Sequence, residues 1–255
     1  MHHDDILTLC GIARLAGQEI LRVAETAFAV DTKADDSPVT QADRASDAII
    51  RQALGELYPD IPILSEESGQ SDYAVRKDWK RFWLVDPLDG TKEFIKRNGE
   101  FTVNIALMEK NRPVFGIIQV PTKDDIYFGG PSQGAFRLSG TGAPVPIAVR
   151  QPAPGAPVLV GASRSHPDAN LDAYLAALPP HELVTAGSAY KFCLLAQGTI
   201  HLYPRFNPTM EWDTAAGQAI VEGAGGRFTA PDGSPFPYNK PCLRNGPFVA
   251  TALAG

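Results

Sequence analysis

The segment 86–91, Asp-Pro-Leu-Asp-Gly-Thr, is the part of the sequence best suited to bind a cation. It follows the apolar run 82–85, whose composition and charged flanks predict a buried strand. Ligand crevices form at the carboxyl ends of such strands, and hard cations such as Mg²⁺ select carboxylate and carbonyl oxygens. Asp86, Asp89 and the Leu88 carbonyl are therefore candidate metal ligands. Taken alone, the segment favours a surface turn, because its residues are good turn formers.

Gly90 adds a means of approaching a phosphate group. It allows close contact with the backbone, and the amides of a helix opening after it could receive a phosphate oxygen. Two other acidic segments could contribute ligands. Glu66 and Glu67 follow a short predicted strand. They could be a solvated acidic pair, or they could supply a further carboxylate to a metal ion. Asp213 stands where a helix begins, as an N-cap or as a metal ligand.

Asp43 also has two interpretations. Thr40 has the character of an N-cap, and Asp43 three residues later matches the acid of a capping box that opens a helix ending near Leu57. A catalytic role for Asp43 is the alternative, and the local sequence does not decide between the two.

The elements that must position these acids differ between two parts of the chain. Up to residue 145, helices are predicted over 6–28 and 40–57, with a polar turn at 33–38 and strands over 61–64, 82–85, 102–108, 114–120, 126–128 and 135–138. From residue 146, strands over 158–161, 183–185, 200–203 and 248–252 alternate with helices over 167–178, 188–197 and 214–222. The predicted fold is thus α+β followed by α/β, with the boundary in the Pro-, Gly- and Ala-rich segment 140–157.

Composition narrows the class of protein. The 255 residues, 44% hydrophobic and 20% charged, are typical of a globular chain, and the formal net charge of −6 disfavours binding of nucleic-acid polymers. No apolar run approaches the ~18 residues of a membrane span, and the acidic N-terminus is unlike a signal peptide. We therefore expect a cytoplasmic protein, with peripheral contact to the inner membrane and the oligomeric state left open. Three dispersed cysteines disfavour disulfides and zinc–thiolate sites.

Three motifs together resemble those of the inositol monophosphatase superfamily of metal-dependent phosphatases. They are Ser-Glu-Glu at 65–67, the segment 86–91, and Trp-Asp-Thr-Ala-Ala-Gly at 212–217. The resemblance implies a layered α/β sandwich with a metal-binding half over 1–145 and a substrate-binding half over 146–255. It implies two Mg²⁺ ions, with a third, weaker ion often invoked: Glu66, Asp86 and the Leu88 carbonyl hold one, and Asp86, Asp89 and Asp213 hold the other. It also implies that Asp43, partnered by Thr91, activates the attacking water, and this favours catalysis for Asp43. Cations would also reverse the field that an acidic protein presents to a phosphate.

The segments 83–95, 98–107 and 161–166 are similar to the 3'(2'),5'-bisphosphate nucleotidase branch of that superfamily. This implies removal of the 3'-phosphate of 3'-phosphoadenosine 5'-phosphate, a by-product of sulfate assimilation, to leave AMP, and inhibition by Li⁺. By position, the substrate-binding residues are Glu66, Leu88, Asp89, Gly90, Thr91, His166, Ser188, Lys191, Arg205 and Asp213. The pair Ala189-Tyr190 departs from the Ser-Leu common in relatives, which bears on the purine side of the pocket.

The outer cationic contacts each have a simpler interpretation. Lys191 could be solvated, Arg205 could pair with Glu211, and His166 could cap a helix. Two other functions also remain open, an inositol- or sugar-phosphate monoesterase and a catalytically silent phosphate binder. A single phosphate does not need remote cations, and a binder has no use for a water-activating pair, so the nucleotidase is the favoured prediction.

Overall fold

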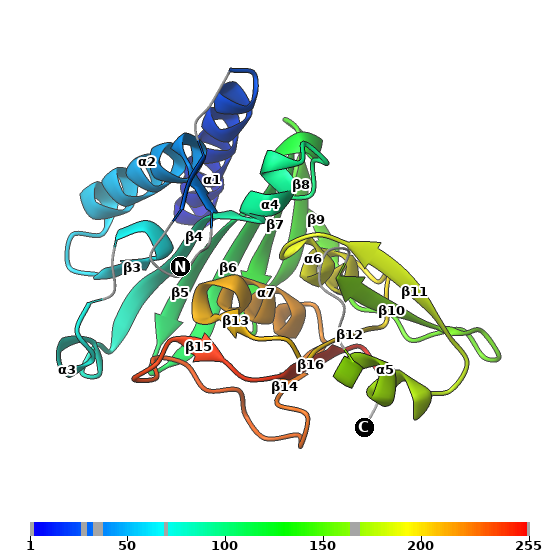
Figure 1. Cartoon of the computed structure of the whole chain (residues 1–255). Helices are drawn as coiled ribbons and strands as arrows, with labels where there is room; N and C mark the ends of the chain where they lie inside the picture. Colours follow the sequence, from blue (N-terminus) through cyan, green and yellow to red (C-terminus); the bar gives the residue numbers. More distant parts are fainter. Residues whose placement is uncertain (1–2, 27–29, 33–37, 69–70, 164–168, 254–255) are drawn as a thin grey trace.

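The computed structural model describes residues 3–26, 30–32, 38–68, 71–163 and 169–253. Its layers alternate between helices and sheets (Figure 1). Helices α1 (His3–Ala24) and α2 (Gln41–Leu57) cover one face of a large sheet, and α6 (Tyr190–Ala196) and α7 (Glu211–Gly223) cover the other. A smaller sheet follows, with α5 (Ala169–Ala176) on its outer face. This arrangement confirms the predicted layered α/β sandwich.

The large sheet has its strands in sequence order. They are β3 (Ile63–Ser65), β4 (Arg81–Asp89), β5 (Thr102–Glu109), β6 (Arg112–Val120), β7 (Asp125–Gly130), β8 (Gly134–Ser139) and β9 (Val145–Ile147). The first two are parallel and the other neighbours are antiparallel, as the predicted meander requires. Strand β4 is apolar on both faces because it separates two cores. Trp83 and Val85 face α1 and α2, while Phe82 and Leu84 join the core that holds α6 and α7.

The smaller sheet is mixed. It contains β10 (Val158–Ser163), β11 (His181–Ala186), β12 (Leu202–Arg205), β14 (Arg227–Thr229) and β16 (Phe248–Thr251), in the order β11-β10-β12-β16-β14. Strand β10 is parallel to β11 and to β12, and the other pairs are antiparallel. The predicted strand–helix alternation therefore describes its first three strands.

Short elements connect these layers. They are β1 (Val30–Thr32), β2 (Pro38–Thr40), η1 (Glu66–Ser68), α3 (Tyr73–Arg76), α4 (Thr91–Ile95), η2 (Pro121–Lys123), β13 (Thr209–Met210) and β15 (Arg244–Asn245). The sequence patterns predicted none of β1, α3, β9, β13 and β15, because two to four residues carry too little periodicity. Within the described residues, no helix has the length and apolarity needed to cross a membrane.

Helix α7 joins the two predicted halves. It packs against β4, β5, β6, β7 and β8 of the large sheet, although it comes from the second half of the sequence. Its approach to β6 is so close that a Cβ atom on Gly116 would lie 2.3 Å from the carbonyl oxygen of Ala216. Strand β9 spans residues 145–147 and pairs with β8, so it straddles the boundary expected at 145/146. The division into a metal-binding and a substrate-binding half stays a prediction. The two parts of the sequence contribute side chains to the same hydrophobic core.

Candidate active site

Strand β4 carries the candidate metal ligands at its carboxyl end. It continues through the segment 86–89 instead of ending at residue 85, and Asp86 and Leu88 are each 1% exposed. The surface-turn interpretation is therefore wrong. Opposite β5 the register shifts between Asp86 and Asp89, which indicates a bulge at Pro87, a residue that lacks a ladder donor. The bulge is held from α2, because the Ser46 hydroxyl donates to the Pro87 carbonyl at 2.7 Å.

Glu66 reaches the same place through the parallel pairing of β3 with β4. Ser65, the last residue of β3, lies beside Val85 in the register, so Glu66 leaves the strand close to Asp86, and the two carboxyl groups interact electrostatically. Glu66 opens the turn η1, which leads the chain away from the sheet. The two acids therefore lie together at the carboxyl ends of parallel neighbours, where ligand crevices form.

Asp43 and Thr91 are in contact, as predicted. Thr91 Oγ1 donates to Asp43 Oδ1 at 3.1 Å, while Asp43 Oδ2 accepts both Thr40 N and Thr40 Oγ1 at 2.7 Å. One oxygen thus closes the capping box of α2, and the other meets the first residue of α4. Both interpretations of Asp43 describe the same carboxylate, because capping fixes its orientation toward Thr91. Asp43 is 2% exposed, so this orientation is set in a largely dry environment.

Asp213 lies in the first turn of α7, but it is not the N-cap. The helix begins at Glu211 and its N-cap is Met210, so both the expected start at residue 214 and the N-cap interpretation are wrong. Asp213 Oδ2 accepts Met210 N at 2.8 Å. This places the carboxylate at the positive end of the helix dipole, which stabilises its negative charge.

Asp89 connects β4 to the turn before α6. Its Oδ2 accepts Ala189 N at 2.5 Å, and the preceding Ser188 has a left-handed backbone with φ of 45°. Gly90 has φ of 92°, and a Cβ atom there would lie 3.2 Å from the Cβ atom of Ser188. The backbone conformation therefore favours glycine at this position, and the limited space adds to that preference.

The acids Asp43, Glu66, Asp86, Asp89 and Asp213, which we call the carboxylate site, repel one another. Burial raises the pKa of Asp86 well above its usual value, and Glu66, Asp89, Asp213 and Asp43 raise it further. Burial and then Asp89 and Glu66 also raise the pKa of Asp213. Burial raises the pKa of Asp89 to about 6, although Lys191 and Arg205 oppose the increase.

This donor set fits divalent cations. Buried carboxylates that raise each other's pKa are stabilised by a nearby positive charge, and oxygen donors are the ligands that hard cations select. As the side chains stand, the described part of the chain holds no formed group of three or more His, Cys, Asp or Glu around a cation position. The acids instead accept protein donors, such as Leu88 N on Asp86 Oδ1 at 3.1 Å. A cation would compete with these hydrogen bonds for the same oxygens.

A small cavity brings two of the acids together with the guanidinium of Arg205. Its volume is about 40 Å³, and its lining includes Asp89, Ser188, Arg205 and Asp213. Arg205, on β12, is partly buried and interacts electrostatically with Asp213 and Asp89. Acids and a guanidinium around one cavity can attract a cation and a phosphate oxygen.

Comparison with known proteins agrees with this geometry. Residues 2–252 match the model of the inositol monophosphatase family. The chain belongs to this family. Its members are metal-dependent phosphatases, typically using Mg²⁺.

Among similar proteins, the 3'(2'),5'-bisphosphate nucleotidase CysQ of Escherichia coli K12 is 46% identical over 90% of this chain and 92% of that protein. The CysQ of Salmonella typhimurium LT2 is 49% identical over 85% of this chain and 87% of its own length. The crystal structure of CysQ from Bacteroides thetaiotaomicron has a TM-score of 0.86 and 40% identity, covering 100% of this chain and 99% of the other. An inositol monophosphatase from Anabaena has a TM-score of 0.75 and 27% identity, covering 97% and 91%.

The outer contacts expected from the family differ in how the fold places them. Lys191 is 0% exposed, and its Nζ donates to the carbonyl oxygens of Ala186 and Ser188 at 2.9 and 2.8 Å. The solvated interpretation of this lysine is therefore wrong. Glu211 pairs with Lys240 at 2.5 Å. His166 lies outside the described residues, so its predicted contact is not placed.

Two further residues reach the turn 187–189 and were not singled out from the sequence. Glu100 Oε2 accepts Gly187 N at 2.8 Å, and Ser188 Oγ donates to Thr102 Oγ1 at 3.2 Å. Both belong to the segment 98–107, whose resemblance to the nucleotidase branch was the available signal. The resemblance marks the whole segment as distinctive, but it does not indicate which of its side chains contacts a turn 86 residues further along the chain.

Proposed function

We propose that this chain is a Mg²⁺-dependent 3'(2'),5'-bisphosphate nucleotidase that hydrolyses the 3'-phosphate of 3'-phosphoadenosine 5'-phosphate to AMP and phosphate. The observation that carries the proposal is the hydrogen-bonded Asp43–Thr91 pair beside the acids that surround buried Asp86, in a chain 46% identical to a nucleotidase of this specificity class. A protein that only binds phosphate needs no such pair.

Two Mg²⁺ ions would be held by the carboxylate site. Glu66, Asp86 and the Leu88 carbonyl would bind one ion, and Asp86, Asp89 and Asp213 the other. When bound, such ions lower the pKa of water and neutralise charge on phosphate and leaving oxygens. The raised pKa of Asp86, caused first by burial and then by its acidic neighbours, supports this assignment because cations would relieve the same repulsion.

The chain's own residues would orient and deprotonate the nucleophile. Thr91 Oγ1 gives its proton to the hydrogen bond with Asp43, so its lone pairs are left to accept a hydrogen bond from water. Deprotonation of that water would pass through Thr91 to the Asp43 carboxylate, which acts as general base. The capping hydrogen bonds from Thr40 keep Asp43 from rotating away.

Recognition of the second phosphate would fall to the cationic side of the cavity. Arg205 lines the cavity directly and is suited to bidentate binding of a phosphate. Lys191 stays a proposed phosphate contact, but its main role would be to hold the turn 187–189 through its two hydrogen bonds to carbonyl oxygens. Its buried charge adds to the positive field at Asp89 even without touching the substrate.

Phosphate release should be measured with 3'-phosphoadenosine 5'-phosphate, adenosine 3'-monophosphate and inositol 1-phosphate, each with Mg²⁺ and with EDTA. We expect the highest kcat/KM for the bisphosphate and no turnover in EDTA. A clearly higher kcat/KM for inositol 1-phosphate would refute the substrate and leave a monoesterase. Absence of turnover on all three, with Mg²⁺ still bound, would point to a silent binder.

Two variants test the cationic side. Arg205→Gln should raise KM for the bisphosphate by more than tenfold and for the monophosphate by much less, because only the bisphosphate presents a second charge. Lys191→Met keeps the buried volume and should show the same preference with a smaller ratio. Equal changes of KM for both substrates would remove these residues from phosphate recognition.

A further inference from the structure

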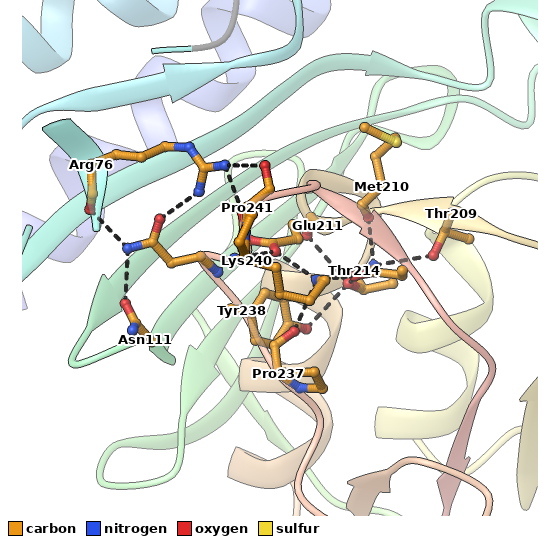
Figure 2. Close-up of polar contacts among 12 residues, drawn as sticks. Arg76, Asn111, Thr209, Met210, Glu211, Thr214, Pro237, Tyr238, Lys240 and Pro241 are labelled. Atoms are coloured by element: carbon orange, nitrogen blue, oxygen red, sulfur yellow. Dashed lines mark hydrogen bonds and ion pairs between the residues drawn. The ribbon is translucent and has the colours of Figure 1, made fainter. Parts of the chain in front are cut away.

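A buried polar network surrounds Glu211, the first residue of α7 (Figure 2). It consists of Arg76, Asn111, Glu211, Asn239 and Lys240, which we call the Arg76 network. Arg76 is 1% exposed and Glu211 is 0% exposed. Charged side chains are rarely buried to this degree unless each is well paired, because desolvation is costly. Because these charges are buried, they do not serve to keep the surface soluble, and their burial needs another explanation.

Arg76 holds the segment 239–241 from the side of α3. Its two terminal nitrogens donate to Asn239 Oδ1 at 2.8 Å, to the Lys240 carbonyl at 2.6 Å and to the Pro241 carbonyl at 2.9 Å. Asn239 returns a hydrogen bond to the Arg76 carbonyl at 2.8 Å and another to Asn111 Oδ1 at 3.0 Å. Asn239 has a left-handed backbone with φ of 56°, which these contacts hold in place.

Glu211 holds the same segment from the side of α7. Its Oε2 accepts Asn239 N at 2.7 Å, and its Oε1 accepts Lys240 N at 3.1 Å and Lys240 Nζ at 2.5 Å. The segment 239–241 is thus gripped between an arginine of α3 and the first residue of α7 (Figure 2). Movement of α3 or of this segment would be transmitted to the start of α7.

The start of α7 is also the position of Asp213. Asp213 Oδ2 accepts Met210 N, one residue before Glu211. Asn245 Nδ2 donates to the Met210 carbonyl at 2.8 Å and to Thr214 Oγ1 at 3.0 Å, and Lys240 Nζ reaches Asn245 Oδ1 at 3.0 Å. The residues on both sides of Asp213 are therefore tied to the network, while Asp213 itself faces the cavity with Asp89 and Arg205.

We propose that the Arg76 network positions the Asp213 carboxylate for cation binding, with Arg76 and Glu211 as positioning residues that touch neither substrate nor cation. The inference rests on the proposed role of Asp213 as a metal ligand. Residues behind metal ligands typically change metal affinity by 10- to 100-fold when altered. Because Arg76 acts through Asn239 and Glu211, we expect the lower end of this range.

The test is direct titration of the full chain with Mn²⁺ by calorimetry, together with the Mg²⁺ dependence of phosphate release. Arg76→Gln should weaken Mn²⁺ binding about tenfold and raise the Mg²⁺ concentration for half-maximal activity by a similar factor. The kcat at saturating Mg²⁺ should fall less than threefold, because the substrate contacts and the Asp43–Thr91 pair are intact. A merely structural role would lower the Tm without this separation.

Asn239→Gly is the second variant. It removes the amide contacts to Arg76 and Asn111 but allows the left-handed backbone, so it keeps the test decisive if Arg76→Gln does not fold. Arg14→Gln is the matched control. Arg14 likewise joins a helix to a loop, through Asp124 Oδ1 at 2.9 Å and the Gly140 carbonyl at 2.6 Å, and its loss should leave Mn²⁺ affinity unchanged.

Mn²⁺ affinity within twofold of wild type in a folded Arg76→Gln or Asn239→Gly protein would overturn the positioning role while leaving the proposed function standing. An equal loss of affinity in Arg14→Gln would also overturn it, since the effect would then follow any weakening of the fold. A wild-type chain that binds no Mn²⁺ would instead refute the proposed metal site, and the positioning role with it.

Discussion

Replacing Asp89 by asparagine should stabilise the metal-free protein while abolishing its activity. The pKa of Asp89 is raised from 3.8 to about 6, chiefly by burial. The stability that comes with the protonated carboxyl is fully present below pH 3.8 and is lost as pH rises through about 6. At pH 7.5 the ionised side chain therefore costs the folded state about 3 kcal/mol.

The measured gain should be smaller than that figure. Asp89 lines a cavity, where solvent screens part of the repulsion, and asparagine leaves an amide that needs new partners. Its carbonyl can keep the hydrogen bond from Ala189 N. We expect the metal-free variant to gain about 2 kcal/mol in free energy of unfolding, or about 4–8 °C in Tm for a chain of this size.

The assay is thermal unfolding in EDTA at pH 7.5 and pH 5.0, alongside phosphate release in Mg²⁺. The gain should shrink at the lower pH, where wild-type Asp89 is largely protonated. Asp60→Asn is the matched control, because it removes an exposed carboxylate of the same kind and should change stability by less than about 0.5 kcal/mol. Adding Mg²⁺ should reverse the order, since wild type binds the ion more tightly.

A metal-free Asp89→Asn protein that is no more stable than wild type at pH 7.5, with the control unchanged, would refute the repulsion argument. Near-wild-type turnover would refute the role of Asp89 as a metal ligand. The two results are independent, so one variant tests both the electrostatics of the carboxylate site and its chemistry.

The other predictions concern the nucleophile, the cations and the thiols. Thr91→Val should lower kcat by about 10²- to 10⁴-fold, because it removes the hydrogen bond to Asp43 that would orient the attacking water. Mn²⁺ affinity should change little, because Thr91 is not a proposed metal ligand. Steady-state kinetics and calorimetry check the two effects. Removing Mg²⁺ with EDTA should lower the Tm at pH 7.5 by several degrees and by less at pH 5.0, as scanning calorimetry would show, because protonated carboxyls need no counter-charge. Burial raises the pKa of Cys10 to about 12 and that of Cys193 well above its usual value, while Cys242 is exposed. A thiol reagent at pH 8 should therefore titrate one thiol per native chain and three per unfolded chain.

Most of the large elements could be predicted from the sequence. The helix from Gln41 to Leu57 begins after Thr40 as its capping box indicates, and the meander from β5 to β8 follows from alternating apolar runs. The start of α7 was placed three residues late, because Met210 supplies no recognisable cap and the capping acid is Asp213 itself. The short strands were missed, since two or three residues carry too little periodicity.

The acids of the site could also be predicted, but their physical state could not. Lys191 was expected to be either a solvated residue or a phosphate contact, and it is fully buried on two carbonyls. Arg76 was not singled out at all, because its partner Asn239 lies 163 residues away. No local pattern reports a contact over such a separation.

The sequence by itself determined which oxygen donors are present, their order along the chain and the family to which that order belongs. These properties depend only on residue type and spacing. The tertiary structure decided that the segment 86–89 is a bulged, buried strand, that Asp43 meets Thr91, and that the start of α7 is tied to α3 through the Arg76 network. Burial, electrostatic field and hydrogen-bond partners arise when distant segments exclude water together, so they exist only in the folded chain.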